Sequence, residues 1–160
     1  YCMTGWRLGY GAGPKVLIEA MKKIQSQSTS AANTIAQNAA IKALELDNSH
    51  FKAIKASLLK RRAIVISALS DLEGFDSNFS QGAFYLFPSI KRFLGKRLNG
   101  NEVILNDTNF CTQLLSSEHV ATVPGSSFGS KDSIRISYAL SEKDLRTGCK
   151  RIKQFCERLR

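Results

Sequence analysis

Long hydrophobic runs are missing from this sequence of 160 residues. No apolar stretch approaches the roughly 18 residues that a helix needs to cross a bilayer, so we expect no transmembrane helix and no membrane partner. The first residues also lack the basic and then apolar pattern of a secretory signal peptide. These absences favour a cytoplasmic protein, but a chain that opens within a motif does not report on organellar targeting.

Paired cysteine spacing is also missing. The four cysteines form no Cys-x-x-Cys pair and have no metal-ligand spacing with His50 or His119. This argues against a metal site and favours reduced, partly buried thiols in a cytosolic protein. The two histidines are expected at helix ends or in loops.

Acidic residues are scarce, with 13 Asp and Glu against 23 Lys and Arg and a net charge of +10. Residues 51–160 hold most of the excess, but its clusters are scattered along the chain, for example at 60–62, 91–92 and 96–97. No aromatic residues alternate with them as a stacking platform for bases. We therefore expect a solvated basic surface and no nucleic-acid partner, with a basic binding module as the alternative.

What is present is the composition of a globular protein, 43% hydrophobic and 22% charged. The composition changes near residues 47–50, from a neutral part rich in Ala and Ser to a basic part. Residues 1–48 are too few to bury a core alone, so they are expected to be the end of a larger domain with an exposed apolar face. Residues 49–160 are expected to form a small α+β domain.

Hydrophobic periodicity and turn residues predict the elements of this α/β fold. The helices are expected to begin near Pro14, Thr34, Phe51, Thr108 and Ser141. Strands are expected over 6–12, 83–87, 120–123 and 133–139, the last three forming one short sheet. Polar stretches at 25–33 and 91–107 are expected to be loops. Ser141 and Asp144 have the spacing of a capping box.

Two arginines stand alone in apolar stretches, Arg7 in MTGWRLGY and Arg135 in SIRISYAL. A guanidinium on a half-buried strand must be paired, and its donors suit phosphate or carboxylate. Arg7 therefore predicts either an anion site or an ordinary ion pair. In the second strand Ile134 and Ile136 face one way and Arg135 the other. Arg135 predicts either an anion site or an exposed side chain on an edge strand.

The segment VPGSSFG, residues 123–129, connects two of the expected strands. Small residues let a backbone approach a ligand closely, but the same composition is typical of a hairpin connection. The segment alone does not decide between the two.

Taken in order, MTGWRLGY, GAGPK, SQSTS, IAQ, GAFYLFP, VATVPGSSFG and IRISYALSEKDL resemble one family along the whole chain. They are similar to the C-terminal part of class I and II aminotransferases with the type I pyridoxal-phosphate transferase fold, most of all the bacterial and plant branch of aspartate aminotransferases. In that family the opening motif follows a lysine that holds the cofactor as a Schiff base. The resemblance places this lysine two residues before Tyr1, so the chain by itself is expected to be inactive.

The resemblance also implies roles for residues of this chain. It implies that Arg7 binds the phosphate of pyridoxal 5'-phosphate and that Arg135 binds the substrate α-carboxylate, with Phe128 near the substrate. It implies that Ser30, with Thr29 beside it, reaches the phosphate in the partner subunit of a homodimer. SAAN follows here where the family has S-N-P-T. The implied substrates are an amino acid and a 2-oxo acid, namely aspartate and 2-oxoglutarate, with an aromatic or prephenate aminotransferase or a non-catalytic binding module as alternatives.

Overall fold

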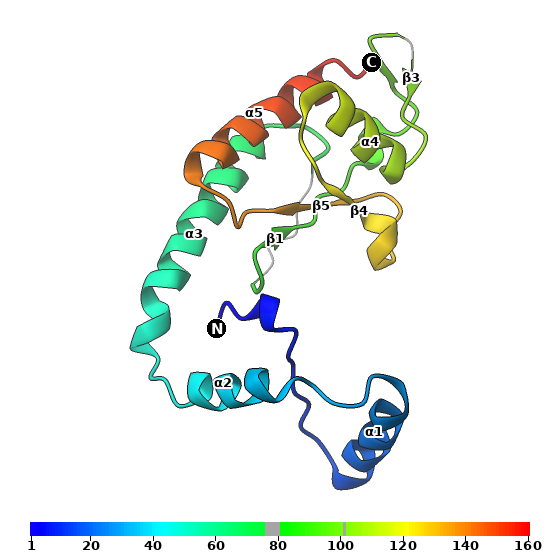
Figure 1. The fold of residues 1–160 in the computed structure, drawn as a ribbon. Helices are drawn as coiled ribbons and strands as arrows, with labels where there is room; N and C mark the ends of the chain where they lie inside the picture. Colours follow the sequence, from blue (N-terminus) through cyan, green and yellow to red (C-terminus); the bar gives the residue numbers. More distant parts are fainter. Residues whose placement is uncertain (76–80, 101) are drawn as a thin grey trace. The chain divides into compact units, whose positions relative to one another are not determined.

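A computed structural model describes residues 1–75, 81–100 and 102–160 (Figure 1). The chain divides into two compact units, Tyr1–Ile54 and Lys55–Arg160, and each is described by itself. The division falls within helix α3 (Ser49–Leu69), the helix expected near residue 51. The assignment of residues 1–48 to the end of a larger domain stays a prediction. Within the described residues, no helix is long and apolar enough to span a membrane.

The first unit holds two complete helices, α1 (Lys15–Ser28) and α2 (Thr34–Leu44), both at predicted places. Asn33 caps α2, because its side chain accepts hydrogen bonds from the backbone N–H groups of Ile35 and Ala36. α1 continues into the stretch expected to be a loop. The strand expected over 6–12 is wrong, because residues Thr4–Trp6 form a short 3-10 helix, η1, and no strand follows it there.

Hardly any side chain of the first unit is buried. Ala36 is the one buried residue among residues 1–54, all of which the structure describes. Its large exposed apolar side chains are Tyr1, Trp6, Tyr10, Val16, Leu17, Met21, Ile24, Ile35, Ile41, Leu44 and Leu46. The expected exposure of apolar surface is therefore confirmed.

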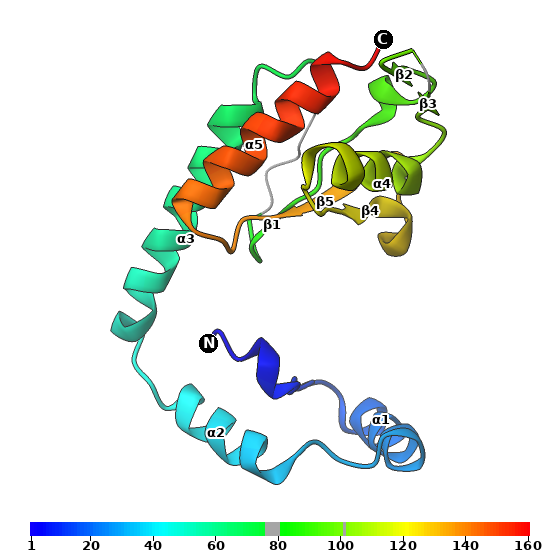
Figure 2. The same ribbon diagram turned by 45° about the horizontal axis from the view of Figure 1, so that its top comes forward.

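The second unit contains the helices α4 (Asp107–Glu118) and α5 (Glu142–Glu157) and the core. Asn106 caps α4 by accepting from Asn109 N, and Ser141 caps α5 by accepting from Asp144 N. The two helices lie next to each other (Figure 2), and the rings of Phe110 and Phe155 pack edge-on with centroids 5.1 Å apart. Both helices were predicted, because caps and apolar spacing are local signals.

The sheet of the second unit is antiparallel in the order β1 (Tyr85–Leu86), β5 (Ile134–Ser137) and β4 (Val123–Pro124). β1 and β5 lie within the strands predicted over 83–87 and 133–139 and are shorter, whereas β4 overlaps the strand predicted over 120–123 only at Val123. In β5 the side chains of Ile134 and Ile136 are buried in the core, whereas Arg135 is partly exposed and Ser137 exposed. The predicted alternation is confirmed, and β5 is the central strand.

The basic stretch expected to be a loop contains further structure. A 3-10 helix, η2 (Lys91–Phe93), precedes a two-stranded ribbon of β2 (Arg97–Leu98) and β3 (Glu102–Val103). Arg97 exchanges backbone hydrogen bonds with Arg160, which ties the ribbon to the end of the chain. Two-residue strands leave too little periodicity to be recognised from the sequence.

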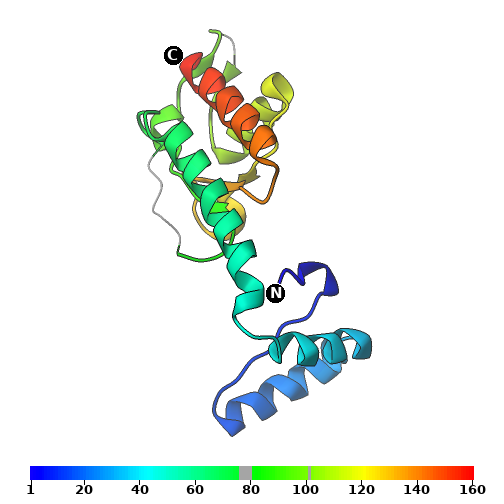
Figure 3. The ribbon, with the colours of Figure 1, turned by 90° about the vertical axis from the view of Figure 1, so that its left-hand side faces the viewer.

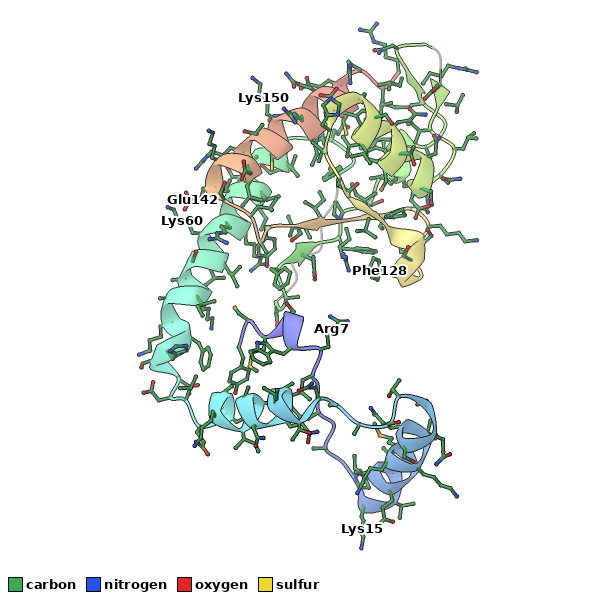
Figure 4. All side chains as sticks on the ribbon, in the orientation of Figure 1. Arg7, Lys15, Lys60, Phe128, Glu142 and Lys150 are labelled. Carbon is green, nitrogen blue, oxygen red and sulfur yellow. The ribbon has the colours of Figure 1, made fainter. Side chains whose placement is uncertain are left out.

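Helix α5 runs beside the part of α3 that belongs to the second unit (Figure 3). Lys60 on α3 forms an ion pair with Glu142 on α5 at 2.7 Å (Figure 4), and Asp71 pairs with Lys153. These pairs are largely exposed, so each contributes little. The apolar contacts of Val65 and Leu69 with the core hold α3 in place.

Candidate anion-binding sites

Arg135 lies over two aromatic rings. Its guanidinium carbon Cζ is 4.3 Å from the ring centroid of Tyr85 and 4.4 Å from that of Phe128. Tyr85 comes from β1, directly opposite Ser137 in the register, and Phe128 comes from the turn before β5. Each contact is of the cation–π kind and contributes about 0.5–2 kcal/mol.

The aromatic contacts leave the hydrogen-bonding edge of Arg135 available. Guanidinium N–H groups donate in the plane of the group, whereas a ring stacks against its face. Among the described residues, no Asp or Glu forms an ion pair with Arg135. The alternative placed Arg135 on an edge strand, but β5 is the central strand of its sheet and Arg135 is only partly exposed. The arrangement suits a bidentate carboxylate or phosphate.

Phe128 stands at the end of the 3-10 helix η3 (Gly125–Phe128), between β4 and β5. The segment VPGSSFG is therefore a hairpin connection between β4 and β5, which was one of its two predicted roles. It also places the ring of Phe128 next to the guanidinium of Arg135. Gly129 follows with φ 83°, a left-handed conformation that glycine adopts without strain. Phe87 packs edge-on against Phe128, with ring centroids 6.1 Å apart.

The turn is fixed to α4 through a buried carboxylate. Asp107 is 3% exposed, and its Oδ2 accepts a hydrogen bond of 2.6 Å from Ser126 N. Burial acts to raise the pKa of Asp107, but hydrogen bonds from Ser126 and from the backbone of Thr108 outweigh it and hold the pKa below its usual value. The group is therefore ionised at neutral pH.

Arg7 has a different setting from the one expected. It is exposed, it follows η1 in a left-handed conformation with φ 51°, and its Nη1 donates to Thr4 O at 3.3 Å. The strand on which it was expected is absent. Among the described residues it forms no ion pair, so the ordinary ion pair that was the alternative is not found. Its remaining donors suit an anion.

Ser30 also has a left-handed conformation, with φ 62°, at the end of α1. Its backbone N–H donates to Gln25 O at 3.0 Å, and its side chain is exposed. The hydroxyl of Thr29 accepts a hydrogen bond from Gln25 Nε2 at 3.2 Å. Within the described residues, no hydrogen bond joins Ser30 to Arg7. Of the four predicted site residues, the structure thus brings Arg135 and Phe128 together.

Tyr85 is the contact that sequence reasoning missed. It lies in the GAFYLFP motif, next to Leu86, which is buried. Because side chains alternate along a strand, Tyr85 stands on the opposite face of β1 from Leu86. Knowing the face of Tyr85 does not show which residue of a neighbouring strand it contacts. That depends on the register, which pairs Leu86 with Ile136 and so places Tyr85 on the face of Arg135.

The sequence model of the family described as aminotransferase class I and II matches residues 1–152. The chain belongs to this family. The cofactor of class I and II aminotransferases is pyridoxal 5'-phosphate, as the resemblance implied. The family assignment predicted from the motifs is thereby confirmed.

Curated aminotransferases resemble the chain along nearly its whole length. An aspartate aminotransferase of Rhizobium meliloti (strain 1021) is 43% identical over 99% of this chain and 39% of the relative. A probable aspartate/prephenate aminotransferase of Rhizobium leguminosarum bv. phaseoli is 46% identical over 98% of this chain and 39% of the relative. The chain therefore spans about two fifths of the length of these relatives.

Solved aminotransferases have the same fold. The crystal structure of the aspartate aminotransferase from Rhizobium meliloti matches with a TM-score of 0.85 and 43% identity, over 100% of this chain and 40% of that chain. An aromatic aminotransferase from Pyrococcus horikoshii matches with a TM-score of 0.75 and 34% identity, over 97% of this chain and 40% of that chain. The predicted type I pyridoxal-phosphate transferase fold is confirmed.

The residues present fit the cofactor of class I and II aminotransferases. Pyridoxal phosphate needs donors for a dianionic phosphate, and Arg7 is exposed and free of acidic partners among the described residues. The Ser30 hydroxyl is exposed as well. A guanidinium and a hydroxyl are both phosphate donors, so the chemistry of this donor set agrees with a phosphate group.

Proposed function

We propose that the protein containing this chain transfers an amino group between an amino acid and a 2-oxo acid with pyridoxal phosphate, and that aspartate and 2-oxoglutarate are its substrates. The observation that carries the proposal is Arg135, held over Tyr85 and Phe128 with no acidic partner among the described residues, in a member of the aminotransferase family. All substrates of such a reaction share one α-carboxylate, which this guanidinium would bind.

The residues of this chain would bind and orient. Arg7 would hold the cofactor phosphate, and Ser30 would reach the phosphate in the partner subunit of a homodimer. Arg135 would hold the substrate α-carboxylate through two parallel N–H donors, with Phe128 beside the substrate. The bound cofactor supplies an electron sink for the carbanion formed at the substrate α-carbon. A lysine two residues before Tyr1 would hold the cofactor and move the proton.

The names of the relatives favour a second substrate pair. Several are described as aspartate/prephenate aminotransferases, among them that of Cereibacter sphaeroides, 44% identical over 98% of this chain. Prephenate is also a 2-oxo acid, so Arg135 would bind the carboxylate of either substrate. The choice between the two lies in residues that bind the substrate side chain, and an aromatic aminotransferase is the further alternative.

The experiment is an assay of the intact protein purified with pyridoxal phosphate. Aspartate and 2-oxoglutarate are supplied, and oxaloacetate is measured by a coupled reaction. Glutamate with prephenate and an aromatic amino acid with 2-oxoglutarate are measured in parallel. Formation of oxaloacetate supports the proposal, and activity confined to the aromatic donor favours the alternative. A protein that binds no cofactor and transfers no amino group is the non-catalytic binding module. A Ser-Lys pair whose lysine lies two residues before Tyr1 would separate the enzyme from such a module.

A further inference from the structure

We propose that Asp107 is a positioning residue for the substrate carboxylate site, because it holds the turn Gly125–Gly129 in the conformation that keeps Phe128 over Arg135. Among the described residues, no hydrogen bond or ion pair joins Asp107 to Arg135. It acts through the turn, and the reaction proposed above assigns it no other task. That the bound group is a substrate carboxylate rests on the proposed function. That Asp107 fixes the position of Phe128 rests only on the geometry of the turn.

The first step is the hydrogen bond between Asp107 and Ser126. The Oδ2–N distance of 2.6 Å is short for a neutral amide donor, as is usual where the acceptor is charged. Asp107 is buried, and this bond joins its carboxylate to the turn, so its loss would leave a buried charge with fewer donors. The bond therefore fixes the backbone at Ser126, two residues before Phe128.

The second step is the frame on the other side of the turn. Gly125 N donates to Ser133 O at 2.8 Å, and Ser130 N donates to Gly125 O at 3.0 Å. The first bond holds Gly125 to the residue that precedes β5, and the second closes the turn on itself. Among the described residues, the backbone of 126–128 has no hydrogen bond to the rest of the unit other than the one to Asp107. Phe128 is half exposed, with 50% of its surface accessible, so packing alone holds it weakly.

The third step is the consequence for Arg135. Phe128 covers the guanidinium at 4.4 Å and limits the directions in which a carboxylate can approach it. If the turn were free, Arg135 would keep its contact with Tyr85 and lose the other ring. A substrate carboxylate would then meet a less ordered arginine, and ordering it on binding costs free energy.

The test combines hydrogen exchange with kinetics in the intact protein with its cofactor. In Asp107→Ala we expect amides of residues 125–129 to exchange about tenfold faster, the size expected for one lost charge-assisted hydrogen bond. We expect kcat/KM for the amino-acid substrate to fall about tenfold, with pyridoxal-phosphate affinity unchanged. Asp144→Ala is the matched control, since it removes a first-turn carboxylate from α5 and does not touch the turn.

A double variant decides whether Asp107 acts through Phe128. If it does, Asp107→Ala combined with Phe128→Ala reduces kcat/KM no further than Phe128→Ala alone. Additive losses overturn the inference, as does unchanged exchange at residues 125–129. If Asp107→Ala does not fold, Asp107→Asn carries the test: its neutral amide oxygen should protect the Ser126 amide less well, and equal protection overturns the inference. Faster exchange in a protein without aminotransferase activity would refute the proposed function and leave the positioning role in place.

Discussion

The guanidinium of Arg135 lies over the ring of Tyr85, 4.3 Å from Cζ to the ring centroid, across the central and an outer strand of the sheet. The two residues are 50 positions apart in the sequence. Their contact covers one face of the Arg135 guanidinium with an aromatic ring. The N–H donors lie in the plane of the guanidinium and remain available to an anion. This arrangement is the basis of the first prediction.

Arg135→Ala in the intact protein should lower kcat/KM for all amino-acid substrates by a similar factor of at least about one hundred, because about 3 kcal/mol of charge-assisted bonding to the shared carboxylate is lost. Pyridoxal phosphate should still bind. The measurement is steady-state kinetics with an acidic and an aromatic amino acid, together with cofactor absorbance. A loss confined to the acidic substrate would show that Arg135 recognises the side chain instead.

Arg7→Lys should weaken binding of pyridoxal phosphate about thirtyfold, since losing one of two parallel hydrogen bonds to phosphate costs about 2 kcal/mol. Absorbance titration of the apo protein with cofactor measures the change. Lys15→Arg is a suitable control on the same unit, because Lys15 is exposed and pairs with Glu19. Equal cofactor affinity in Arg7→Lys and wild type would remove Arg7 from the phosphate site.

Gly125→Ala should destabilise the protein by about 1–3 kcal/mol, because a Cβ at this buried position would collide with the carbonyl oxygens of Ser130 and Ser133. Gly148→Ala is the opposite case. It lies within α5 with open space around its Cβ, and alanine there should stabilise the helix by up to about 1 kcal/mol. Urea unfolding followed by circular dichroism gives both values. Equal effects of the two substitutions would contradict the packing of the turn.

Asp107 should make stability depend on pH at the acidic end. Hydrogen bonds from Ser126 hold its pKa below the ordinary value of an aspartate, so the folded protein binds a proton less readily than the unfolded chain. The stabilisation is therefore fully present above about pH 5 and is lost as the pH falls through the lowered pKa. In Asp107→Asn this part of the pH dependence should vanish, so the difference in unfolding free energy from wild type should shrink below pH 4. A difference that stays constant from pH 7 to pH 3 would exclude this linkage.

The four thiols should differ in reactivity. Cys2 is exposed, whereas Cys111, Cys149 and Cys156 are buried and free. Burial raises the pKa of Cys149 to about 11 and that of Cys156 to about 12, so neither is a thiolate at pH 8. A disulfide reagent should modify one thiol rapidly in the native protein and all four after unfolding. Cys2→Ser should abolish the rapid phase, and a rapid phase that survives would place a second thiol at the surface.

Much of the helical structure could be predicted from the sequence, because its signals are local. Asn33 and Ser141 cap helices that begin directly after them, and the apolar spacing of α5 brings Leu145, Cys149 and Ile152 into the core. The lengths of the strands could be predicted less well, because strands of two to four residues show little alternation of buried and exposed residues. The prediction of an extended segment around Arg7 was wrong because the short sequence TGWR forms a 3-10 turn. A single turn is too short to leave a periodic pattern in the sequence.

The sequence by itself determined the family, the helices and the face of β5 on which Arg135 stands, since these follow from motifs, caps and alternation along one segment. Only the tertiary structure decided what Arg135 meets. Tyr85 reaches it through the register of β1 on β5, and Phe128 through a turn that Asp107 holds from another helix. Each of these depends on contacts between distant segments, which form when the core closes and which no single stretch of sequence encodes.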